Sequence, residues 1–128
     1  MSNELKRYCL ITGCAGSIGQ SLARGFSSAG YQVIATDIEV KPDGLDCLHY
    51  IQADLSSIVD DEQYAANFFS TVRKHIGGNG LHVLINNAAI QILGGVDSLT
   101  WQDWQNTLDV NLLAPFFMTK LLLPELEA

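Results

Sequence analysis

Short apolar runs alternate along the chain with segments in which apolar residues recur every three or four positions. The continuous runs predict strands that are buried on both faces, and the periodic segments predict helices with one buried side. We expect strands at 7–12, 32–37, 48–54 and 81–86. This alternation of strand and helix predicts an α/β fold built on a parallel sheet.

Three helices are expected between and after these strands. The first begins near residue 18 and stops at Gly30, the second begins at Asp60 and Asp61, and the third runs from about 101 to 123. Their apolar stripes are, in order, Ile18, Leu22, Phe26 and Ala29; Tyr64, Phe68, Val72 and Ile76; and Trp101, Trp104, Leu108 and Leu112. We interpret the second stripe as core.

A glycine-rich turn joins the first strand to the first helix, with the sequence TGCAGSIG over 12–19. Glycine leaves backbone N–H groups accessible, and the positive end of the helix dipole points at the same place, so the turn favours a phosphate. Within a strand–turn–helix–strand unit of about 30 residues, the expected ligand is a dinucleotide pyrophosphate. The candidate residues in this turn are Gly13, Gly16, Ser17, Ile18 and Gly19.

Asp37 ends the second strand, 18 positions after Gly19. A carboxylate there can accept hydrogen bonds from the adenosine ribose and repel a 2′-phosphate. The glycine turn also contains no basic residue to pair with such a phosphate, so we predict NAD in preference to NADP. Ile38 is included in the predicted site, and the alternative for Asp37 is a solvated turn acid.

Asp54 and Leu55 follow the third strand. In an open parallel sheet the carboxyl ends of the strands line the ligand crevice, which places these two residues near the adenine. The alternative is that Asp54 is a polar residue leading the next helix.

Composition narrows the function classes. The chain has 128 residues, a length typical of one domain, with 7 basic and 14 acidic residues and no basic cluster, which argues against nucleic acid or an anionic membrane as partner. No run is long enough to cross a bilayer, and the N-terminus lacks a secretory pattern. The unpaired spacing of Cys9, Cys14 and Cys47 indicates packing residues in a reducing cytoplasm. The histidines lack metal-ligand spacing, so no metal is expected.

Two further motifs carry a family resemblance. The run LINNAA over 84–89 resembles the Asn-Asn-Ala-Gly signature of short-chain dehydrogenases/reductases, and DVN over 109–111 resembles the segment carrying their active-site asparagine. The resemblance implies a Rossmann-type doubly wound sheet of strand order 3-2-1-4. It also implies that Asn87 and Ala88 contact the cofactor and that Asn111 is catalytic.

The resemblance has departures. Ser17 stands where the classical glycine pattern has its middle glycine, and the G-x-x-G-x-x-G spacing is commoner in the extended subfamily. Ala89 replaces the usual glycine of the strand-four signature.

Pro115 has no N–H to donate to the carbonyl of Asn111, four residues before it. This predicts either a helix kink or a free carbonyl that holds a water in the family's proton relay.

The resemblance covers residues 1–128 as the NAD(P)-binding N-terminal half of the family pattern, ending before the fifth strand. No tyrosine of this chain is followed four residues later by lysine, so the family's Tyr-x-x-x-Lys pair is missing. We therefore expect no turnover from these residues alone, and self-association through the uncovered fourth strand or last helix.

Three functions stay open. The first is an NAD-dependent oxidoreductase acting on an alcohol or carbonyl substrate. The others are a non-catalytic NAD-binding or interaction module, and an epimerase or dehydratase of the same superfamily.

Overall fold

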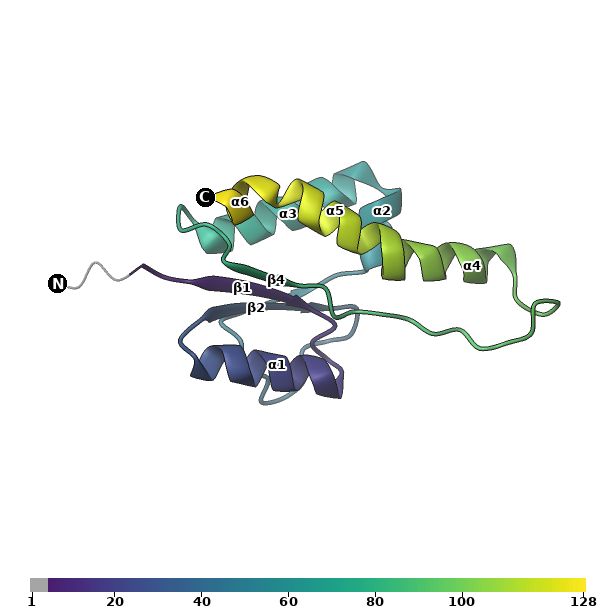
Figure 1. The fold of residues 1–128 in the computed structure, drawn as a ribbon, viewed down its shortest axis with the longest axis horizontal. Coiled ribbons are helices and arrows are strands. Elements are labelled where there is room, and N and C mark those ends of the chain that lie inside the picture. The colour runs from purple at the N-terminus through teal and green to yellow at the C-terminus, as the bar shows by residue number, and fades with distance from the viewer. Residues whose placement is uncertain (1–4) are drawn as a thin grey trace.

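The computed structural model describes residues 5–128. Its centre is a parallel sheet of four strands in the order β3-β2-β1-β4, which confirms the predicted order and the Rossmann-type fold (Figure 1). The strands are β1 (Tyr8–Thr12), β2 (Gln32–Asp37), β3 (His49–Gln52) and β4 (Val83–Ile85).

Helices cover both faces of the sheet. One face carries α1 (Ser17–Ser28), and the other carries α2, α3, α5 and α6 (Figure 1). The bounds of the remaining helical segments are α2 (Leu55–Asp60), α3 (Glu62–Ile76), α4 (Trp101–Leu108), the π-helical η1 (Asp109–Leu113), α5 (Ala114–Leu121) and α6 (Leu123–Glu127).

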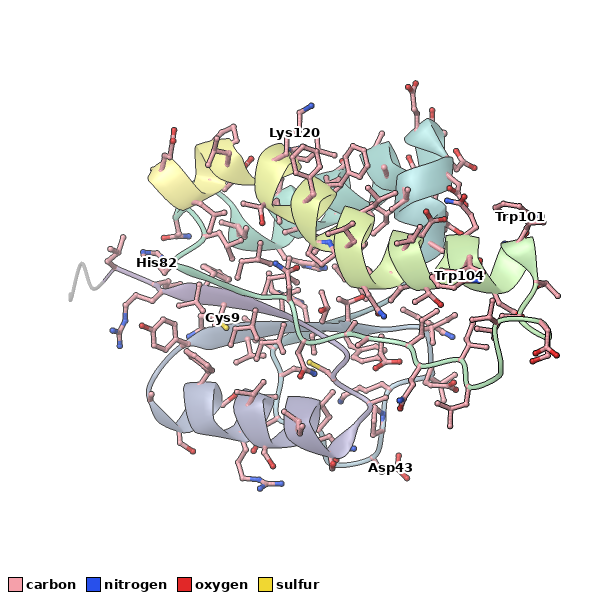
Figure 2. All side chains as sticks on the ribbon, turned by 45° about the vertical axis from the view of Figure 1, so that its right-hand side comes forward. Cys9, Asp43, His82, Trp101, Trp104 and Lys120 are labelled. Atoms are coloured by element: carbon pink, nitrogen blue, oxygen red, sulfur yellow. The ribbon has the colours of Figure 1, made fainter. Side chains whose placement is uncertain are left out.

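The sheet separates two cores because alternate strand residues point to opposite faces. Tyr8 and Leu10 of β1 pack with α3 and α5, whereas Cys9 and Ile11 pack on the α1 side. Figure 2 shows Cys9 between the sheet and α1. Both faces of β1 are therefore buried, as its continuous apolar sequence predicts.

The strand bounds differ most from prediction at β3 and β4. The structure gives His49–Gln52 in place of 48–54 and Val83–Ile85 in place of 81–86. At the start of β4, Leu81 N–H donates to the carbonyl of Glu125 in α6 rather than to a strand. Beyond its end, Asn87 N–H donates to the Thr12 side chain.

The second predicted helix is two helices. Residues 55–60 form α2, and Asp60 ends that helix instead of beginning the next one. Asp61 separates the two with an extended backbone, and its carboxylate caps α3 by accepting from Gln63 N–H and Tyr64 N–H. The predicted core stripe on α3 is correct, since Phe68, Val72 and Ile76 are buried and Tyr64 packs against them.

The first predicted stripe is wrong at Ile18, which is 68% exposed, and at Ala29, an exposed residue just beyond the end of α1. Gly19 and Ala23 are the buried residues of α1, and Leu22 and Phe26 of the predicted stripe are partly buried against the same core.

The third predicted helix is continuous in direction but changes its hydrogen bonding. The Ala114 N–H donates to the Asp109 carbonyl five residues back, which defines the π-helical turn η1 just before Pro115. The wider turn accommodates Pro115, which has no N–H to donate, so the helix has no sharp kink there.

An apolar stripe is exposed along α4, η1 and α5. Trp101 is 91% exposed and Leu112 62%, and Figure 2 shows Trp101 at the end of α4 farthest from α5. The other stripe residues are Trp104, Leu108 and Phe116. Within residues 5–128, no helix combines the length and apolar character needed to cross a membrane.

Candidate functional site

A cavity of about 410 Å³ lies at the carboxyl ends of the strands. In an open parallel sheet this is where ligands bind. All the predicted cofactor residues line it: Gly13, Gly16, Ser17, Ile18, Gly19, Asp37, Ile38, Asp54, Leu55, Asn87 and Ala88. Ala89, Ile90 and Val110 extend its wall toward η1. Asn111 is not among the lining residues and lies one position beyond Val110.

The three glycines of the turn have different roles. Gly13 has a φ of +71°, and a Cβ there would lie 2.8 Å from the Ala88 Cα. A Cβ on Gly19 would overlap the Gly13 carbonyl oxygen. Gly16 differs, because a Cβ on this residue would lie 3.7 Å from its nearest neighbour, the Gly13 carbonyl oxygen. Packing within the protein thus requires glycine at 13 and 19. At Gly16 the space beside the backbone is instead open to a ligand.

Gly16 is also the N-cap of α1, and no side chain caps this helix. The N-terminus of the 12-residue helix α1 therefore presents backbone N–H groups and the positive end of its dipole at the cavity. Ser17 adds a hydroxyl donor at the same place.

Asp37 connects the end of β2 to the glycine turn. Its Oδ2 accepts from Ala15 N–H at 2.9 Å, and its Oδ1 accepts from Glu39 N–H at 3.0 Å. A carboxylate has about four lone-pair positions, so acceptor capacity is left for a ligand hydroxyl. None of the described residues that line the cavity is lysine or arginine.

Asp54 fits both interpretations of its sequence position. It lines the cavity, and it is also the N-cap of α2, where Oδ1 accepts from Ser56 N–H at 3.0 Å. Its own N–H donates to the Tyr64 hydroxyl at 2.8 Å, so the α3 stripe supports this corner.

Sequence reasoning missed the role of the Thr12 side chain. Its buried Oγ1 accepts from Asn87 N–H at 3.1 Å and from Ala88 N–H at 2.9 Å. The Asn87 side-chain amide donates in return to the Thr12 and Gly13 carbonyls, each at 3.2 Å. These bonds hold the segment after β4 against the glycine turn. The sequence feature that could have indicated this role is a threonine at the end of a strand that is predicted to be buried.

The Asn111 side chain makes a two-bond contact that the sequence did not indicate. Its Oδ1 accepts from Ile90 N–H at 2.9 Å, and its Nδ2 donates to the Ile90 carbonyl at 2.8 Å. This pairing fixes the segment after β4 against η1. The main-chain carbonyl of Asn111 faces Pro115 four residues later, which has no N–H to donate.

The cysteines near the site are packing residues. Burial raises the pKa of both Cys9 and Cys14 to about 12, so both thiols stay protonated at neutral pH. The Cys14 thiol donates to the Ile11 carbonyl at 3.2 Å. Among residues 5–128, no group of three or more metal-ligating side chains is placed to hold a metal ion.

Comparison with known proteins agrees with this architecture. The short chain dehydrogenase family matches residues 7–128, and the chain belongs to this family. Mouse retinol dehydrogenase 5 is 33% identical over 125 residues, which are 94% of this chain and 39% of that protein. The chain spans about two fifths of the length of the curated relatives it matches.

Solved structures share the fold. A 4-hydroxyisoleucine dehydrogenase complexed with NADH has a TM-score of 0.75 and 26% identity, covering 91% of this chain and 48% of the other. A metagenomic short-chain oxidoreductase in complex with NADP has a TM-score of 0.79 and 26% identity, covering 94% of this chain and 57% of the other. The family resemblance inferred from the sequence is therefore confirmed.

Proposed function

We propose that residues 1–128 form the NAD(P)-binding domain of an oxidoreductase that transfers hydride between NAD and an alcohol or carbonyl substrate. One observation carries the proposal: the glycine turn, Asp37, Asp54 and the Asn87–Ala88 pair converge on a single cavity. The structures of dehydrogenases with bound NADH or NADP support a nicotinamide cofactor.

The residues present fit such a cofactor. The backbone at Gly16, Ser17 and Ile18, with the open space at Gly16, would hold the pyrophosphate. Asp37 would accept from the adenosine ribose, and Ile38, Asp54 and Leu55 would border the adenine. Gly13, Gly19, Asn87 and Ala88 would shape the remaining wall. When bound, the nicotinamide supplies the hydride chemistry.

We propose NAD in preference to NADP. The Asp37 carboxylate is fixed beside the glycine turn by Ala15 N–H, and no basic side chain lines the cavity in the described structure. A 2′-phosphate would meet a negative charge without a compensating positive one.

Asn111 is proposed to serve the active site through its main-chain carbonyl, while its side chain holds Ile90. The acid/base work of the family needs a Tyr-x-x-x-Lys pair, which these 128 residues do not contain. Without a positioned general acid or base, rates fall by roughly 10²–10⁴. These residues alone are therefore proposed to be inactive.

The exposed stripe on α4 and α5 favours a second candidate, a non-catalytic NAD-binding module that acts by oligomerising. The glycine spacing with Ser17 keeps an epimerase or dehydratase as a third. In each case we propose a homo-oligomer located in the cytoplasm, in keeping with the three free cysteines.

Calorimetric titration with NAD tests the proposal. Gly16→Ala fills the space beside the turn and is expected to weaken NAD binding at least about tenfold, a loss of about 1.4 kcal/mol. The control is Gly25→Ala in the same helix, where a Cβ meets no atom within 4 Å, and NAD affinity should be unchanged. Equal affinities for both variants would contradict the proposed cradle.

A further inference from the structure

Two aspartates lie on α2 and η1, which pack against each other. Asp60 is the last residue of α2, and Asp109 is the first residue of η1. Burial and the neighbouring Asp109 carboxyl, through its charge and a side-chain hydrogen bond, raise the pKa of Asp60. Neither residue lines the cavity described above, although Leu55 of α2 and Val110 of η1 do.

Asp109 is completely buried, whereas Asp60 is exposed. The Asp109 Oδ1 accepts from the Gln105 side-chain amide at 2.7 Å. The Asp109 Oδ2 is buried and has no donor among residues 5–128. A buried carboxylate oxygen without a donor is unfavourable, so this atom requires either a proton or a cation beside it.

The surroundings of the pair hold no compensating positive charge in the described structure. From the β3–α2 corner, Asp54 adds a third acidic group that acts on Asp60. On α4, the Asp103 carboxylate accepts from Thr100 N–H, and at the start of α3 the Asp61 carboxylate caps its own helix. The basic residue of α5, Lys120, lies over the Phe116 ring.

We propose that Asp60 and Asp109 share one proton, with the Asp60 O–H donating to the Asp109 Oδ2, and that this carboxyl pair positions η1 against α2. The proton gives each Asp109 oxygen a donor, because Gln105 already serves Oδ1.

The pKa of Asp60 is raised above its ordinary 3.8, first by desolvation and then by the charge of Asp109, the hydrogen bond to Asp109 and the charge of Asp54. A raised folded-state pKa means that the folded chain holds the proton more tightly than the unfolded chain. The contribution to stability is then fully present below pH 3.8 and is lost as pH rises through the raised value.

The pair joins two helices that carry site residues. The cavity wall includes Leu55, the first residue of α2, and Val110, the second residue of η1. Asn111, the next residue of η1, holds Ile90. Loss of the shared proton leaves two carboxylates in contact, so the α2–η1 contact loosens beside the cavity.

The first test replaces the proton with a permanent donor. Asp60→Asn supplies an amide N–H to Asp109 at every pH, and thermal unfolding is followed from pH 4.5 to 8. We expect the Tm of Asp60→Asn to exceed that of the wild type by a margin that grows with pH to about 3 °C at pH 8. Asp43→Asn is the matched control, since Asp43 is exposed and lies on the α1 side, away from α2 (Figure 2).

Two outcomes of this test overturn the proposal. One is an Asp60→Asn margin that does not change with pH or equals that of Asp43→Asn. The other is a millimolar Ca²⁺ or Mg²⁺ effect that raises the Tm of the wild type but not of Asp60→Asn, which would assign the pair to a cation.

A second measurement follows the pair in the wild-type chain. The ¹³C chemical shift of the Asp60 carboxyl in the wild-type chain should titrate with a midpoint above 3.8, and Asp109→Asn should lower that midpoint. A wild-type midpoint at or below 3.8 would refute the shared proton. Neither test uses a nucleotide, so the proposal stands or falls separately from NAD binding.

Discussion

The Asp37 Oδ2 accepts a hydrogen bond from the Ala15 N–H at 2.9 Å. The residue that we propose as the discriminator between NAD and NADP therefore also holds the glycine turn at the end of β2. A variant that removes the whole carboxylate changes both properties, whereas an amide preserves an acceptor for Ala15 without the charge.

Asp37→Asn should therefore separate charge from position. We expect the ratio of NADP affinity to NAD affinity to rise about tenfold, equivalent to about 1.4 kcal/mol, because repulsion of the 2′-phosphate is removed. Asp37→Ala should in addition weaken NAD binding, since the Ala15 N–H loses its acceptor. Competition titration measures both ratios, and wild-type affinities that are equal for NAD and NADP would contradict the role assigned to Asp37.

The Asn111 side chain should control protection of the segment after β4. In Asn111→Ala the Ile90 N–H loses its acceptor, and its hydrogen exchange should become at least about fivefold faster, the factor that corresponds to about 1 kcal/mol. Asn106→Ala, five residues earlier on α4, is the control, because within residues 5–128 the Asn106 side chain bonds only to Gln102 of its own helix. Unchanged exchange at Ile90 in Asn111→Ala would show that the bond is not formed in solution.

Much of this arrangement was predictable from local sequence. The strand order follows from two βα crossovers and a return, and most cavity residues follow from the rule that ligands bind at the carboxyl ends of parallel strands. Asn87 and Ala88 were inferred from the family resemblance. The bounds of β2 were predicted to the residue, because Gly30 precedes it and an acid ends it. The steric requirement at Gly13 and Gly19 is likewise local.

The missed features depend on contacts between distant residues. The pairing of Asn111 with Ile90 spans 21 positions and leaves no periodic pattern. The six residues of α2 are too few to show a helical period, so its cap at Asp54 could be weighed only as an alternative. The sequence predicted a kink or a free carbonyl at Pro115 rather than a π-turn, and it gave no sign that Asp109, at the start of that turn, is buried.

The exposed apolar stripe predicts self-association of the 128-residue chain. Light scattering at low micromolar concentration should show a dimer or a larger species, because Leu112 and its neighbours expose large apolar side chains on one helix face. Leu112→Lys should shift the population toward monomer. Val40→Lys, which changes a residue that is 71% exposed elsewhere, should not.

A monodisperse monomer of the wild-type chain with a sharp cooperative melt would contradict this expectation. It would show that these residues close their own core without a partner.

The most direct test of the central claim is to follow the backbone amide NMR signals of the chain during titration with NAD. We predict that the signals that shift belong to residues 13–19, 37–38, 54–55 and 87–88, which surround one cavity, and that those of Trp101 and Trp104 stay in place. Absence of shifts at millimolar NAD, or shifts confined to residues outside the cavity, would contradict the assignment of this site to NAD.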